Sequence, residues 1–106
     1  MRSAIDAALA AARRRGELTV EIDLRGPDRA AVLTRVAAAL EFPAYFGHNL
    51  DALHDCLTDL SWLPAPGYCL ALIVGPLPDP VVQAFTDAAD AWRAHGVPFE
   101  LHFLHH

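Results

Sequence analysis

The sequence predicts an α/β domain in which helices pack against a three-stranded parallel sheet. Segments with apolar residues at helical spacing alternate along the chain with short strand-like segments, and Gly, Pro and Asp separate them. Strands that are joined through helices favour parallel pairing with right-handed crossovers. The chain has 106 residues, 54% of them apolar, so we expect a single domain with one hydrophobic core over residues 1–106.

The first half of the chain is predicted to form a helix, a strand and a second helix. Residues 3–15 are rich in Ala, Leu and Arg, and Gly16 is a typical helix stop. Residues 19–24 alternate apolar and polar side chains, as a strand does. Asp28 can cap the next helix, which Pro43 ends. The apolar residues of that helix recur at helical spacing: Val32, Leu33, Val36, Ala37 and Leu40.

The second half is predicted to add a helix, a strand, a helix and a strand. Asn49 is well placed to cap a helix over residues 50–60. Residues 69–74 form a continuous apolar run, which is typical of a strand buried on both faces. A helix with Asp and Pro at its start and Gly at its end is expected over residues 79–96, and residues 99–104 form the last strand.

Charge and hydropathy argue against nucleic-acid and membrane partners. The net charge is −5 with His neutral, whereas direct nucleic-acid binding needs Lys and Arg against phosphates. No apolar stretch reaches the roughly 18 residues that a membrane span needs. The apolar run over residues 7–12 precedes three arginines, the reverse of the order in a secretory signal, so we expect a cytoplasmic protein.

The two cysteines, Cys56 and Cys69, are expected to be small buried thiols and not a disulfide scaffold. Each lies in an apolar element, and a reducing compartment favours the free thiol. No CxxC pair or spaced His/Cys cluster indicates a zinc site, so we expect no metal ion and no other cofactor.

The helix over residues 50–60 has two distinct faces. At about 100° per residue its leucines fall on one side: Leu50, Leu53, Leu57 and Leu60. Asp51, Asp55 and Asp59 form a ridge on the opposite side, at spacing i, i+4 and i+8. Like charges at this spacing cost about 0.2–0.5 kcal/mol per pair, and no Lys or Arg within the helix offsets Asp59 near its C-terminus. The ridge is either a binding surface or an ordinary solvated face, and the pattern by itself leaves both open.

Bulky side chains fill the loop before this helix. Tyr45, Phe46 and His48 surround Gly47, which we expect to provide a positive φ angle or a close approach. Phe42 or Phe46 can be a staple onto the core, whereas an aromatic group beside a row of carboxylates is a typical anchor for a protein partner.

An enzymatic site is a second interpretation of the same region. His48, Asp51, His54 and Asp55 are close in sequence, so a His could act as a general base oriented by an Asp. Cys56 points away from the acidic ridge, no Ser nucleophile falls at a suitable place, and there is no glycine-rich phosphate loop. A metal site from these four residues lacks a defensible geometry. We therefore expect the chain not to be an enzyme.

The stretch over residues 42–60, FPAYFGHNLDALHDCLTDL, resembles the segment by which the barstar family of intracellular ribonuclease inhibitors is recognised. The likeness is long and ungapped, and the order of elements agrees over residues 19–104. The helix within residues 1–17 looks like an addition to the family's fold. Residues 105–106 are His-His, a tail that we leave out of the functional argument.

The resemblance implies a barstar-like α/β fold that plugs the active site of a basic, secreted, guanyl-specific ribonuclease of the barnase type. In that family an aspartate of this helix takes the place of an RNA phosphate, and Asp55 matches it. Asp51 matches the other helix carboxylate. The partner-binding surface is therefore expected to comprise Tyr45, Phe46, Gly47, Asn49, Asp51, His54, Asp55, Thr58 and Asp59.

Several positions depart from the family pattern. His54 stands where the familiar inhibitor has tryptophan, and Asp59-Leu60 stand where it has glycine and tryptophan. Trp62 can restore part of the lost aromatic surface. His54 would add a pH dependence in an interface, and is otherwise an ordinary exposed histidine. The same substitutions fit an alternative in which the fold is an interaction or immunity module for a non-ribonuclease toxin or a regulatory partner.

Overall fold

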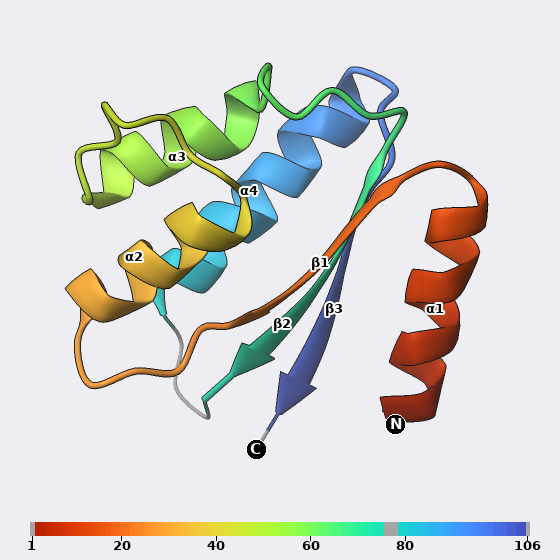
Figure 1. The fold of residues 1–106 in the computed structure, drawn as a ribbon, viewed down its shortest axis with the longest axis horizontal. Coiled ribbons are helices and arrows are strands. Elements are labelled where there is room, and N and C mark those ends of the chain that lie inside the picture. Colours follow the sequence, from red (N-terminus) through yellow and green to blue (C-terminus); the bar gives the residue numbers. More distant parts are fainter. Residues whose placement is uncertain (1, 76–78, 106) are drawn as a thin grey trace.

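A computed structural model describes residues 2–75 and 79–105 of the chain. Its elements are α1 (Arg2–Arg14), β1 (Leu18–Asp23), α2 (Arg29–Ala39), α3 (Leu50–Asp59), β2 (Tyr68–Val74), α4 (Pro80–Ala94) and β3 (Phe99–His105). Their order is the predicted one (Figure 1). His105, expected to belong to a tail, is the last residue of β3 and pairs with Val74. Met1 and His106 lie outside the described residues.

The three strands form one parallel sheet in the order β1-β2-β3, which confirms the predicted fold class. In the register of the sheet, Leu70 of the central strand lies between Val20 of β1 and Leu101 of β3. The continuous apolar run of β2 is explained by this position, because a central strand covered on both faces has no solvent side.

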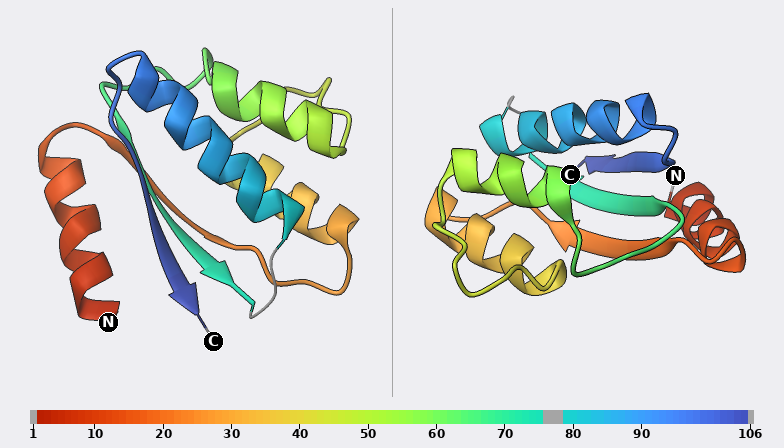
Figure 2. Two further views of the ribbon diagram at one scale, coloured as in Figure 1. Left: turned by 180° about the vertical axis from the view of Figure 1, so that it is seen from behind. Right: turned by 90° about the horizontal axis from the view of Figure 1, so that it is seen from above.

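Helices cover both faces of the sheet. Figures 1 and 2 show α2, α3 and α4 on one face and α1 on the other. Alternate residues of β2 face the two layers, so Leu70 and Leu72 join the large core under α2–α4, whereas Cys69 and Ala71 join a smaller cluster under α1. The α1 residues in that cluster are Ile5, Leu9 and Ala12. Cys56 and Cys69 are both buried free thiols, as expected.

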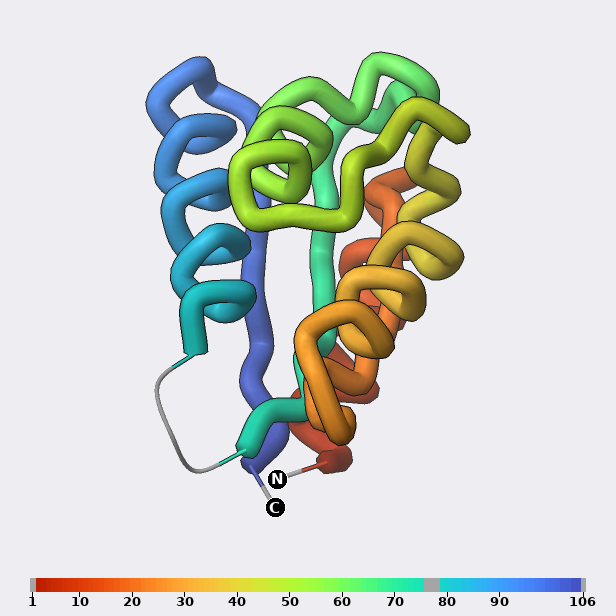
Figure 3. The backbone as a smooth tube through the Cα atoms, turned by 90° about the vertical axis from the view of Figure 1, so that its left-hand side faces the viewer, coloured from red at the N-terminus to blue at the C-terminus, as the bar shows by residue number. Residues whose placement is uncertain are grey.

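Helix α3 is tied to the rest of the fold by side-chain hydrogen bonds to backbone carbonyls. The indole N–H of Trp92 in α4 donates to the Leu57 carbonyl at 2.8 Å. After the helix, the Trp62 indole donates to the Leu40 carbonyl of the α2 C-terminus at 3.0 Å, and the Tyr68 hydroxyl donates to the Leu63 carbonyl at 2.7 Å. Figure 3 shows α3 between α4 and α2. These contacts hold α3 and its exposed face in one orientation.

Candidate partner-binding surface

The N-terminus of α3 is fixed by Asn49, whose backbone is extended at φ −134° and ψ 170°. Its Oδ1 accepts from the Ala52 N–H at 2.8 Å, as an N-cap does, and its Nδ2 donates to the Gly47 carbonyl at 3.3 Å. Asn49, predicted as a contact residue, is thus engaged in capping and in holding the preceding loop. Its side chain is exposed and positions the surface, and its contact with a partner stays a prediction.

Gly47 and His48 meet two different conformational requirements of the loop. We expected Gly47 to supply either a positive φ or a close approach. The positive φ of 52° belongs to His48, while a Cβ on Gly47 would lie 3.1 Å from the Asn49 Nδ2. The glycine thus permits the close approach to the cap, and the left-handed residue is its neighbour.

The aromatic side chains of the loop have separate roles. Tyr45 is 76% exposed and is the one large exposed apolar side chain among the described residues. Phe46, predicted to lie in the binding surface, is 6% exposed; its ring packs against Phe42 at 4.9 Å between centroids and against His48 at 4.7 Å. Phe46 is thus the staple onto the core and supports the surface from below. Trp62 is half-buried, and its indole N–H is held by the carbonyl of Leu40 at the end of α2, so only part of its ring can add aromatic surface.

The acidic ridge lies on the exposed side of α3. Asp51, Asp55 and Asp59 are all exposed on α3, and within residues 2–75 and 79–105 no ion pair involves any of them. The opposite face is in the core: Leu53, Leu57 and Leu60 are buried and Leu50 is half-buried. Beside the ridge, His54 is exposed, and half-buried Thr58 donates its hydroxyl to the His54 carbonyl at 2.8 Å.

The field around this surface is strongly negative. Between residues 36 and 92 the sequence has seven carboxylates and no Lys or Arg; the eight arginines all lie outside this stretch. Burial is the main cause that raises the pKa of the Cys56 thiol, and the charges of Asp59 and Asp55 raise it further. The charges of the ridge therefore also affect a buried thiol of the same helix.

A groove of about 680 Å³ runs beside the ridge between α3 and α4. Leu50 and His54 line it from α3, and Gln83 and Asp87 line it from α4 together with Asp79, the N-cap of that helix. Asp79 was predicted to cap α4, and its side chain does accept a hydrogen bond from the Val81 N–H. That Asp79 and Asp87 lie near α3 was not predicted. The i, i+4, i+8 spacing of residues 79, 83 and 87 was the available signal for a polar face turned toward one neighbour.

A general base in this region would require a hydrogen bond between a histidine and an aspartate. The ring Nδ1 of His48 pairs instead with the Phe46 carbonyl at 3.2 Å. Across the part of the chain that the structure describes, no hydrogen bond joins His48 or His54 to Asp51 or Asp55. The histidine and aspartate side chains of this region are thus exposed and are not hydrogen-bonded to one another among the described residues.

Fold and surface together define a small α/β domain that presents a rigid acidic helix, flanked by an exposed tyrosine, to solvent. The chain belongs to the Barstar (barnase inhibitor) family, whose sequence model matches residues 17–103. The match begins after α1, so the helix that covers the second face of the sheet lies outside it. The family is one of inhibitors and not of enzymes. A comparison with curated proteins found no match. None of the described helices is long and apolar enough to cross a membrane.

Proposed function

We propose that this protein binds and blocks the active site of a secreted microbial guanyl-specific ribonuclease of the barnase type. The observation that carries the proposal is the exposed row of Asp51, Asp55 and Asp59, unpaired among the described residues, on a helix anchored to the core. Membership of the barnase-inhibitor family supports the choice of partner.

The chemistry of the two surfaces is complementary. A ribonuclease that cleaves at a phosphate gathers cationic side chains around it, and a carboxylate offers similar oxygens for charge-assisted hydrogen bonds. Asp55 is the central member of the ridge, so it is the side chain that we assign to the phosphate position. Asp51 and Asp59 extend the negative charge along the helix on either side. Tyr45 provides the apolar anchor at the N-terminal end.

The fixed geometry of α3 favours tight binding. The Asn49 cap at one end and the Trp92 hydrogen bond to Leu57 hold the helix before any partner arrives. Binding then costs little conformational entropy in the inhibitor. An inhibitor of this kind acts in the cytoplasm of the cell that makes the enzyme, where it protects that cell's RNA.

A panel of secreted guanyl ribonucleases, assayed for RNA cleavage against increasing inhibitor, tests the proposal. Wild type is expected to inhibit at least one enzyme stoichiometrically. Asp55→Asn removes the charge and keeps the size; it should raise the inhibition constant at least about a hundredfold, because breaking a buried ion pair costs about 3–5 kcal/mol and 1.4 kcal/mol is tenfold.

Asp6→Asn is the matched control, because it makes the same change of net charge on α1, on the other face of the sheet. It should inhibit like wild type. Equal loss in both variants would show that only overall charge matters. If wild type inhibits no enzyme of the panel, the ribonuclease assignment fails. The departures at His54 and Asp59 would then favour the alternative, in which the same ridge binds a non-ribonuclease toxin or a regulatory protein.

A further inference from the structure

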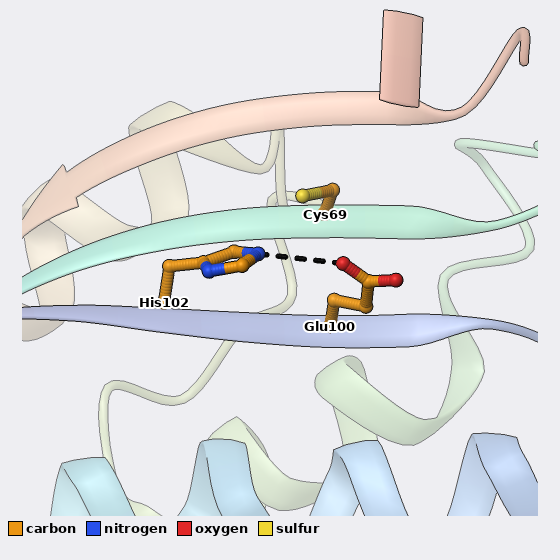
Figure 4. A group of neighbouring side chains, drawn as sticks. All are labelled: Cys69, Glu100 and His102. Carbon is orange, nitrogen blue, oxygen red and sulfur yellow. Dashed lines mark hydrogen bonds and ion pairs between the residues drawn. The ribbon is translucent and has the colours of Figure 1, made fainter. Parts of the chain in front are cut away.

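A second group of chemically reactive side chains lies on the other face of the sheet, beside α1. Cys69 of β2 pairs in register with Glu100 of β3, and Ala71 pairs with His102. Glu100 and His102 are two residues apart, so their side chains emerge on the same face as that of Cys69. Figure 4 shows the three side chains close together on neighbouring strands.

The ligand atoms of this cluster have the spacing of a metal site. The Cys69 Sγ, a Glu100 carboxylate oxygen and a His102 ring nitrogen all lie within 4.8 Å of one another, and the Glu100 Oε2 is 3.3 Å from the His102 Nε2. Two atoms bound tetrahedrally to Zn²⁺ at about 2.0–2.2 Å lie about 3.3–3.6 Å apart. The Glu–His pair already has this separation, and a modest approach of the sulfur completes a tripod.

Cys69 is the buried member of the cluster. Its side chain is 0% exposed, and across residues 2–75 and 79–105 no hydrogen bond involves its thiol. Glu100 is exposed and His102 half-exposed, so the tripod has a buried sulfur at its base and a side that is open to solvent.

We propose that Cys69, Glu100 and His102 bind a divalent transition-metal ion, with Zn²⁺ the ion best suited to a sulfur, nitrogen and oxygen donor set. Binding would displace the thiol proton to solvent and leave a thiolate on the metal. Three protein ligands leave the fourth position for water. Hard ions such as Mg²⁺ and Ca²⁺, which prefer six or more oxygen ligands, do not fit this set.

The site is independent of the proposed inhibitory surface. It lies on the α1 face of the sheet, whereas α3 lies on the opposite face (Figure 1). A bound ion would cross-link β2 to β3 beside the apolar residues of α1. The sequence predicted no metal site because Cys69 is far along the chain from Glu100 and His102, and only the parallel register brings the three residues together.

Titration of the full chain with Co²⁺, followed by displacement with Zn²⁺, tests the proposal. Wild type should bind one Co²⁺ and show a near-ultraviolet sulfur-to-cobalt charge-transfer band, and Zn²⁺ should remove that band and raise the thermal midpoint. Cys69→Ala should lose the band. Glu100→Gln and His102→Gln, at positions with access to solvent, should fold and bind at least about tenfold more weakly.

Two controls separate this site from other metal ligands of the chain. Cys56→Ala removes the other buried thiol and should keep the band, and H105A/H106A removes the terminal histidine pair and should also keep it. A wild type without the band, a band that survives Cys69→Ala, or a band lost in either control would overturn the assignment. Ribonuclease inhibition is measured in a separate assay, so a failure of the metal-site proposal can be distinguished from a failure of the inhibitor proposal.

Discussion

Leu60 ends α3 in a left-handed backbone conformation that normally favours glycine, and its replacement is a direct test of how this helix is held. Its φ is 47° and its ψ 26°, its N–H donates to the Cys56 carbonyl at 3.1 Å, and its side chain is 1% exposed. The left-handed conformation costs a non-glycine residue about 1–2 kcal/mol. Truncating a buried Leu to Ala costs about 2–5 kcal/mol. Burial thus outweighs strain, and every truncation should destabilise the domain.

The informative quantity is the difference between Leu60→Gly and Leu60→Ala. Glycine removes the left-handed cost of about 1–2 kcal/mol but loses about 0.5–1 kcal/mol through its greater freedom in the unfolded chain, so it should be the more stable variant by up to about 1.5 kcal/mol. Leu57 is the matched control, because it is fully buried one turn earlier in the helix interior. There the Gly variant should be the less stable one by about 1 kcal/mol.

Urea unfolding of the four variants measures both differences, with the same sucrose concentration added to all if any is too unstable. The sign of the Gly-minus-Ala difference should reverse between position 60 and position 57. If Leu60→Ala were more stable than Leu60→Gly by the margin seen at Leu57, the backbone at Leu60 would be helical in solution. Leu60 would then not end α3 in a left-handed conformation.

Three further predictions concern charge and capping. Hydrogen bonding to Arg25 is the main cause that lowers the pKa of Asp23 from 3.8 to about 2. Because the Asp23 side chain is 35% exposed, Asp23→Asn should lower the free energy of unfolding by only about 0.5–1 kcal/mol at pH 7. Urea unfolding at several pH values should show this difference from wild type disappearing as pH falls from 3.8 toward 2, where the wild-type carboxylate also loses its charge. Asn49→Ala should cost about 1 kcal/mol of unfolding free energy, since it removes the cap on α3; an unchanged urea midpoint would contradict the capping role. For a ribonuclease that the protein inhibits, Asp51→Asn should slow association several-fold at low salt and by a smaller factor at about 0.5 M salt in stopped-flow measurements, because exposed charges steer the encounter and salt screens them.

The element order was predictable because the local signals in this sequence agree with one another. The predicted helix caps are formed by Asn49 and Asp79. The predicted helix stops, Gly16 and Gly96, have positive φ angles of 79° and 78°, and the apolar run forms the buried strand β2. Most element ends differ by one or two residues, and α2 ends at Ala39, three residues short of the end that Pro43 predicted, because the last turn of a helix and the first pair of a strand depend on tertiary contacts. The face of α3 that carries the aspartates followed from helical geometry alone.

The features that were not predictable depend on contacts between distant segments. Which phenylalanine is the staple was left open by the sequence, and packing against Phe42 and the core decides it for Phe46. The left-handed residues His48 and Leu60 carry no glycine signal, because the surrounding packing outweighs their local cost. The cluster of Cys69 with the β3 side chains needs the sheet register, which no single segment encodes.

The cost of the acidic ridge is small beside the burial that holds α3. Two like-charge pairs at i, i+4 cost together about 0.4–1 kcal/mol, and the helix dipole adds to this at Asp59 while it favours Asp51. Each buried leucine on the opposite face contributes about 1.5–3 kcal/mol, and Leu53, Leu57 and Leu60 are all at most 1% exposed. The helix therefore forms in spite of its ridge, so removing the Asp55 charge, which takes part in both like-charge pairs, should leave the fold as stable as before or slightly more stable. A loss of binding in Asp55→Asn can then be attributed to the interface, because the fold has no need of that charge.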